Sequence, residues 1–348
     1  YAGAASFADV SEAFSPISSG PFKIERFTGD TIRLTKNTSY WDARSVKLST
    51  IVLLLDNKPT EMTEAFNRGE VQWLCGSIDL TKVAAPHTIH ITPMFATEYL
   101  YFNTNTPPCS NQTVREALVN AIPYETLRKD YLIPAKTLVF PLVGYPSVTG
   151  INQQDTVKAE KLLKTIEPAA MEKPIKILLP ETEFYSAQAA LLKKAWEQLH
   201  FSVEVTLVPF ENYYDRLKTD EYHIALVSWI GDFADPLAFL ELFRSGSSLN
   251  SSGWGSKEYE NNIKKASAEQ NRKTRLEYLA KAEQLLLDSS VLIPLSHVPA
   301  INVIDLSDIK GWYVNAVNIH PFKFIRFVQP EALPNIAVNT GYSVQHRN

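Results

Sequence analysis

Hydrophobic and polar residues alternate with a period of two in much of the first hundred residues, as expected for strands with one solvent-facing side. Phe22–Phe27 and Thr31–Thr35 show this pattern on either side of a Thr-Gly-Asp turn signal, which predicts a hairpin. The continuous apolar run Thr50–Leu55 predicts a strand covered on both faces. A short helix over Thr60–Asn67 and a strand over Gly69–Leu74 are expected to follow.

From Tyr99 onward, apolar residues at helical spacing alternate with short apolar runs. The predicted helices span Asn111–Ile122, Thr156–Ile166, Phe184–Leu199, Glu211–Leu217, Lys257–Ala268 and Arg272–Leu287. The predicted strands are Pro174–Leu179, Ser202–Leu207, a run ending at Trp229, and Val291–Leu295. This succession predicts an α/β fold with a mostly parallel sheet and helices on its faces.

The apolar strand that ends at Trp229 stops abruptly at Gly231, presents Asp232, and gives way to a helix after Pro236. A carboxylate at the end of a buried strand is costly unless a cation or hydrogen-bond donors meet it. Asp232 is therefore a candidate counter-ion for a positive group, such as the α-amine of a free peptide. The alternative is a helix N-cap or turn residue, because aspartate is favoured at both.

Composition narrows the class of protein. The 348 residues are 45% hydrophobic with a formal net charge of −4, which predicts more than one domain and argues against nucleic acid as a partner. Uninterrupted apolar runs of about 18 residues are missing, so association with a membrane is expected to be peripheral at most. Cys75 and Cys109 are interpreted as two buried free thiols or, alternatively, as a disulfide. The chain opens with Tyr1, which suggests processing or trimming.

Motifs of catalysis are absent from the sequence. Gly253-Trp254-Gly255 lacks the third glycine and the preceding strand of a dinucleotide-binding loop. His87 and His90 lie among β-forming residues, where a separation of three places the two rings on opposite faces and disfavours a zinc site. We therefore expect no enzymatic activity, no metal and no organic cofactor.

Several segments occur in the order found in one protein family. They are Ser19–Ile24, Ile32–Asn37, Tyr40–Asp42, Glu61–Gln72, Phe102–Thr104, Pro107–Pro108, Val114–Leu118, Trp229–Pro236, Asn250–Tyr259 and Arg275–Val298. In this order they resemble the oligopeptide and dipeptide extracytoplasmic solute-binding proteins of bacterial ABC importers. The resemblance covers residues 19 to about 327.

The resemblance implies a periplasmic-binding-protein-like architecture of two lobes that close around a ligand. It places a partial first lobe at 1–99, a C-terminal α/β lobe at 100–298, a return to the first lobe at 299–327 and an extension at 328–348. Only eighteen residues precede Ser19, whereas the family carries a long segment there. The C-terminal lobe is therefore expected to be complete and the first lobe incomplete.

The resemblance also implies how a ligand is held. Asp232 would take the α-ammonium of a peptide, and the main chain of Ser228, Trp229 and Ile230 would pair with the peptide as an added strand. Leu226 stands where some oligopeptide binders carry an arginine that reads the ligand carboxylate.

Four further residues were considered for the ligand site. Tyr185 matches a pocket-lining position of the family. Trp254 would line a side-chain pocket, or alternatively is an ordinary half-buried tryptophan. Arg216 and Lys218 are candidate carboxylate partners, with solvated helix-end cations as the favoured alternative.

The function implied by the resemblance is non-catalytic binding of short peptides and their delivery to an ABC-type permease. The protein would act in the periplasm or at the cell surface, where a lipid anchor would require a segment outside this chain. Two alternatives remain open at this point. One is the same fold with a nickel complex, haem, a sugar or another small solute as ligand, and the other is a shortened surface interaction protein without a transport role.

Overall fold

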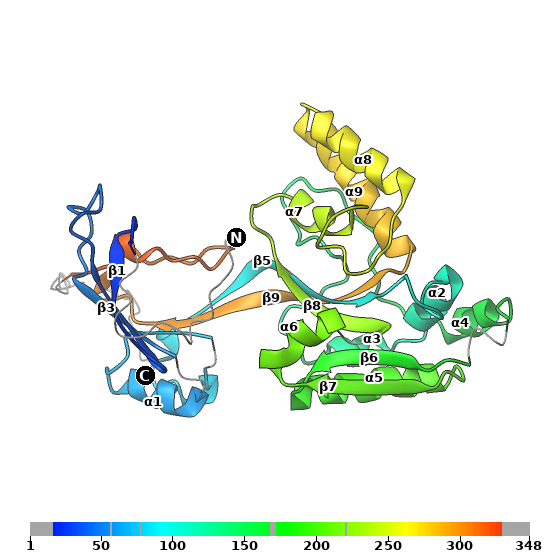
Figure 1. Ribbon diagram of the computed structural model, residues 1–348, viewed down its shortest axis with the longest axis horizontal. Coiled ribbons are helices and arrows are strands. Elements are labelled where there is room, and N and C mark those ends of the chain that lie inside the picture. The colour runs from blue at the N-terminus through cyan, green and yellow to red at the C-terminus, as the bar shows by residue number, and fades with distance from the viewer. Residues whose placement is uncertain (1–16, 56–57, 77, 168–171, 220, 329–348) are drawn as a thin grey trace, which may run out of the picture. The chain divides into compact units, whose positions relative to one another are not determined.

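The computed structural model describes residues 17–55, 58–76, 78–167, 172–219 and 221–328. The chain divides into two compact units, and each is coloured by residue number in Figure 1. Unit 1 comprises residues 1–91, 301–314 and 319–348, and unit 2 comprises residues 92–300 and 315–318. The strands β5 (Ile89–Phe102) and β9 (Leu292–Ile304) each contain residues of both units. The extension predicted from residue 328 lies, apart from Val328, outside the described residues.

Unit 1 contains an antiparallel sheet in the order β1-β2-β3, which confirms the predicted hairpin. The prediction that the third strand is covered on both faces is wrong, because Val52 and Leu54 are 48% and 47% exposed. The strands are β1 (Phe22–Thr28), β2 (Thr31–Lys36) and β3 (Thr50–Leu54).

The rest of unit 1 agrees less closely with the elements predicted from the sequence. Helix α1 (Pro59–Asn67) confirms the predicted helix, whereas β4 (Trp73–Cys75) is shorter than the predicted strand. Gly69 has φ +76°, a left-handed conformation that ends the helix in a turn and delays the strand. The remaining short elements are 3₁₀ turns at Leu80–Lys82, Pro86–Thr88 and Phe322–Phe324 and the strands β10 (Ile309–Lys310) and β11 (Arg326–Phe327).

Unit 2 is built on a sheet in the order β9-β5-β8-β6-β7. Its further strands are β6 (Ile175–Pro180), β7 (Val203–Val208) and β8 (Ile224–Ile230). β6 pairs in parallel with both β7 and β8, but β5 pairs antiparallel with β8. The predicted α/β class is confirmed. The prediction of a mostly parallel sheet is wrong, because the sheet is mixed. β5 and β8 are separated by more than a hundred residues that include β6 and β7, so a single β-α-β crossover does not set their relative direction.

Several helices of unit 2 begin directly after a capping side chain. Asn111, Thr182, Ser256 and Asn271 each accept a hydrogen bond from a backbone N–H of the first turn that follows. The helices are α2 (Gln112–Asn120), α3 (Tyr124–Arg128), α4 (Thr156–Leu163), α5 (Glu183–Glu197), α6 (Phe210–Thr219), α7 (Leu237–Leu240) with the 3₁₀ turn Glu241–Phe243, α8 (Lys257–Ala268) and α9 (Arg272–Asp288). α8 and α9 pack side by side (Figure 1). Every helix predicted from periodicity is present.

One large hydrophobic core fills unit 2. Phe95 and Phe102 of β5, Trp196 of α5 and the α9 stripe from Leu276 to Leu286 all contribute buried side chains. Pro294 lies within β9, and beside it Ser296 bridges to Pro134 of a loop.

Two further sequence predictions concern cysteines and membranes. Cys75 and Cys109 are both free thiols, but only Cys109 is buried, so the prediction that both are buried is wrong. Among the described residues, none of the helices has the length and apolar character required to cross a bilayer.

Candidate functional site

Strand β8 has different neighbours at its two ends. Over its whole length it pairs with β5, from Phe102↔Ile224 to Ala96↔Ile230. On the other side it pairs with β6 only at Ile224 and Ala225. Beyond this point the Tyr213 hydroxyl lies within hydrogen-bond distance of both main-chain groups of Leu226, at 3.0 Å from the nitrogen and 2.9 Å from the oxygen. The tyrosine therefore ends the β6 ladder and leaves the last part of β8 with one open edge.

The direction of the main-chain groups on this open edge follows from the ladder. The N–H of Gly231 donates to the Phe95 carbonyl at 2.8 Å, whereas both main-chain groups of Leu226 face Tyr213. In an antiparallel pair, alternate residues bond to the partner strand. The main-chain groups of Trp229 therefore face β5, and those of Ser228 and Ile230 face the open edge. The strand-addition hypothesis named Ser228, Trp229 and Ile230. With this direction of the main-chain groups, only Ser228 and Ile230 can pair with an added strand.

The end of β8 is held tightly at Gly231. A Cβ atom at this position would lie 2.5 Å from the ring of Phe95, so only glycine fits. The next residue, Asp232, is exposed, and its carboxylate makes no hydrogen bond or ion pair with any other described residue. An anion without a partner follows directly after the open edge.

Asp235, three residues after Asp232, is the acid with a structural role in this turn. Its carboxylate accepts a hydrogen bond from the N–H of Leu237, the first residue of α7, at 3.0 Å. It also forms a bidentate ion pair with Arg275 of α9, at 2.6 and 3.0 Å. The turn-residue alternative therefore applies to Asp235, and Asp232 remains available for a ligand.

Glu98 is a further candidate site residue that was not predicted from the sequence. It lies opposite Ser228 in the β5–β8 ladder, so both side chains lie on the same face of the sheet. Its carboxylate accepts hydrogen bonds from the hydroxyls of Tyr131, at 2.7 Å, and Tyr185, at 2.8 Å. Burial raises the pKa of Glu98 above its ordinary value, and the two tyrosine hydrogen bonds oppose this. An acid inside an otherwise apolar strand was the available signal.

Tyr185 is thus half-buried at the start of α5 with its hydroxyl on Glu98. Its backbone N–H donates to the capping side chain of Thr182 at 3.0 Å, which fixes its position. Its role as a pocket residue stays a prediction.

The two tryptophans of the predicted site both have structural contacts. The indole N–H of Trp229 donates to the Ala238 carbonyl at 2.9 Å, which ties β8 to α7. Trp254 is 9% exposed and packs edge-to-face on Tyr259 with ring centroids 5.1 Å apart. This burial favours the alternative that Trp254 is an ordinary packed tryptophan.

Arg216 and Lys218 are exposed in the last turn of α6. Lys218 forms an ion pair with Asp215 at 2.9 Å. Their position favours the interpretation as solvated cations near a helix C-terminus.

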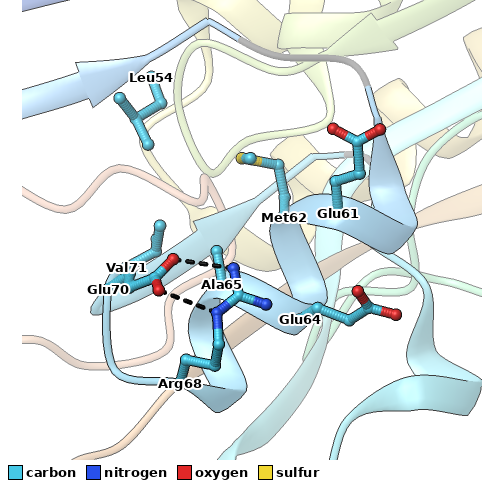
Figure 2. Close-up of a pocket in the computed structure, with 8 residues that line it drawn as sticks. All are labelled: Leu54, Glu61, Met62, Glu64, Ala65, Arg68, Glu70 and Val71. Carbon is cyan, nitrogen blue, oxygen red and sulfur yellow. Dashed lines mark hydrogen bonds and ion pairs between the residues drawn. The ribbon is translucent and has the colours of Figure 1, made fainter.

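Unit 1 has a surface groove of about 320 Å³ along α1, shown in Figure 2. Glu61, Glu64 and Glu70 line it, and Arg68 forms two hydrogen bonds to Glu70 at 2.9 and 2.8 Å. The arginine that faces this groove is already paired, and none of the residues predicted for ligand binding lines it.

Residues 4–251 match the model of a protein family described as bacterial extracellular solute-binding proteins, family 5, middle part. The chain belongs to this family. The family predicted from the sequence is thereby confirmed.

Curated relatives agree with this assignment. The oligopeptide-binding protein OppA of Bacillus subtilis is 28% identical over 302 residues, which cover 80% of this chain and 55% of the relative. The dipeptide-binding protein DppE of the same organism is 26% identical and covers 80% of this chain and 54% of the relative. The chain thus spans about half the length of these relatives.

Solved structures confirm the periplasmic-binding-protein-like fold. The murein tripeptide binding protein MppA of Escherichia coli matches with a TM-score of 0.75 at 23% identity, covering 89% of this chain and 64% of that one. DppA of Helicobacter pylori, solved with the peptide STSA, gives a TM-score of 0.74 at 21% identity, covering 90% and 64%.

Proposed function

We propose that this chain binds short peptides non-covalently by strand addition along the open edge of β8. The observation that carries the proposal is this edge itself, where the main chain of Ser228 and Ile230 faces outward and the strand leads into the unpaired Asp232. Main-chain pairing would give affinity with little dependence on sequence.

Asp232 would receive the α-ammonium of the peptide. A charge-assisted hydrogen bond of this kind contributes about 1.5–3 kcal/mol, more than a neutral one. The same carboxylate would orient the ligand, because a peptide whose amine lies beyond the end of β8 runs back along the edge antiparallel to it.

The names of the relatives support peptides as the ligand class, since they are described as oligopeptide-, dipeptide- and murein-peptide-binding proteins. We further propose delivery of the peptide to an ABC-type permease. The periplasm or the cell surface, with or without a lipid anchor, is the proposed location.

The proposal is tested by mass spectrometry of material released when the purified chain is denatured, together with calorimetry on the ligand-free chain. Co-purified short peptides and saturable binding of a tetrapeptide pool are expected. Binding of sugars, haem or a nickel complex in preference to every peptide tested would contradict the proposal.

A further inference from the structure

Glu98 lies one strand away from the open edge of β8. The ladder places it directly opposite Ser228, and both side chains share one face of the sheet. Ser228 is exposed and has a short side chain, whereas the equivalent position two residues earlier is filled by the buried Leu226. The path from the open edge across β8 to Glu98 is therefore wider at Ser228 than at Leu226.

The register of the proposed ligand follows from the same edge. If Asp232 holds the amine, the first ligand residue lies opposite Ile230 and the third lies opposite Ser228, because outward-facing main-chain groups recur every two residues. Side chains alternate between faces along a strand. The third side chain then shares the face of Ser228 and Glu98, and the second points to the other face.

Distance selects a long side chain. Neighbouring strands lie about 4.8 Å apart, so the ligand backbone would lie roughly 10 Å from that of Glu98. Lysine and arginine have flexible stems that, together with the glutamate side chain, cover two strand spacings. A short or branched apolar side chain would not reach the carboxylate.

The chemistry around Glu98 suits a cation. Tyr131 and Tyr185 each donate to one carboxylate oxygen, and each oxygen retains capacity for a further donor. In the described part of the chain no lysine, arginine or histidine is paired with this carboxylate.

The two tyrosines that donate to this carboxylate belong to a cluster of aromatic rings. The ring of Phe184 lies edge-to-face with the rings of Tyr131 and Tyr185, at centroid distances of 5.0 and 5.3 Å. Aromatic faces attract ammonium and guanidinium groups, and a buried carboxylate gains most from a cationic partner.

We propose that Glu98, Tyr131, Phe184 and Tyr185 form a subsite for a basic side chain at the third residue of the bound peptide. This inference rests on the proposed function, because the register is set by Asp232 and the open edge of β8. The subsite would give the protein a preference for lysine or arginine at the third peptide residue, whereas the rest of the peptide would be bound mainly through its main chain.

The test is calorimetric titration of the ligand-free chain with two matched pairs of peptides. Ala-Ala-Lys-Ala is expected to bind at least about ten-fold more tightly than Ala-Ala-norleucine-Ala, which has a side chain of similar length without the charge. Ala-Lys-Ala-Ala and Ala-norleucine-Ala-Ala are expected to bind equally. In Glu98→Gln, which keeps an acceptor for a tyrosine, the ratio between the affinities of the lysine and norleucine peptides at the third position should fall to about one.

The outcomes separate the two proposals. Peptides that bind without preference for lysine at the third position, or a preference unchanged in Glu98→Gln, would overturn the subsite and leave the proposed function intact. Failure of all four peptides to bind would overturn the proposed function and the subsite with it. The wild-type comparison alone decides the case if Glu98→Gln does not fold.

Discussion

Unit 2 contains two carboxylates that accept hydrogen bonds from tyrosine hydroxyls, and their surroundings differ. Glu283 of α9 is fully buried and accepts hydrogen bonds from the N–H of Val139, at 2.8 Å, and the hydroxyl of Tyr145, at 2.9 Å. Glu98 accepts two tyrosine hydroxyls but lies beside the open edge of β8. The same tyrosine–carboxylate hydrogen bond therefore stabilises a closed interior at Glu283, whereas at Glu98 it lies beside an open strand edge, where we propose that it serves a ligand.

The largest expected effect is the pH dependence of the free energy of unfolding that arises from the buried Glu283. Burial raises the pKa of Glu283 to about 7, above the ordinary value of 4.5. The folded chain then holds a proton that the unfolded chain releases between these pH values. The stability contributed by protonated Glu283 is therefore fully present below about pH 4.5 and is lost as the pH rises through 7, a change of roughly 3 kcal/mol.

Glu283→Gln removes this titration. The free energy of unfolding of the variant, relative to that of the wild type, should therefore increase by roughly 3 kcal/mol between pH 4.5 and pH 8. Urea unfolding at several pH values measures it. Glu98→Gln is the matched control and should move less, because Glu98 is only half-buried. Equal changes in unfolding free energy for Glu283→Gln and Glu98→Gln would contradict the view that Glu283 is enclosed and Glu98 is open on one side.

The next contrast lies between adjacent positions of β8. Val227→Pro should cost about 2 kcal/mol or more, because the N–H of Val227 is assigned to the ladder with β5. Ser228→Pro should cost less than half of that and should weaken peptide binding about ten-fold, because it removes an N–H from the open edge. Urea unfolding and calorimetry measure the two effects. A larger loss of stability for Ser228→Pro would show that the assigned direction of the main-chain groups is reversed.

The smallest contrast lies within the loop after β8. Asp235→Ala should cost about 1.5 kcal/mol, since it removes the acceptor of the Leu237 N–H and the partner of Arg275. Asp232→Ala should change stability by less than about 0.5 kcal/mol, as expected for an exposed residue without partners. Thermal unfolding of both variants in parallel decides the matter. A destabilising Asp232→Ala would assign this residue a structural role.

Local signals in the sequence were sufficient for much of the fold. The helix Lys257–Ala268 was predicted to the residue, and the structure shows that the side chain of Ser256 caps its start. Strand direction was not predictable, since the antiparallel neighbour β5 is separated from β8 by more than a hundred residues. The exposure of Val52 and Leu54 was missed because an apolar run alone does not show what covers it.

In the candidate site, too, some residues could be found from local sequence patterns and others depend on residues distant in the sequence. Asp232 was identified from an anion placed after a strand, a local pattern. Nothing local distinguishes it from Asp235, because the partner Arg275 is 40 residues away from Asp235. Glu98 was missed because its partners Tyr131 and Tyr185 lie 33 and 87 residues from it. Residues that act through distant partners need the tertiary structure to be found.

The most direct test of the central claim combines one substitution with one chemical change in the ligand. Calorimetry would compare a free and an N-acetylated tetrapeptide on the wild-type chain and on Asp232→Asn. Loss of the ion pair predicts at least about ten-fold weaker binding from either change alone and little further loss when both are combined. Equal binding of free and acetylated peptide to the wild-type chain, or a loss in Asp232→Asn that is the same for both peptides, would contradict the account.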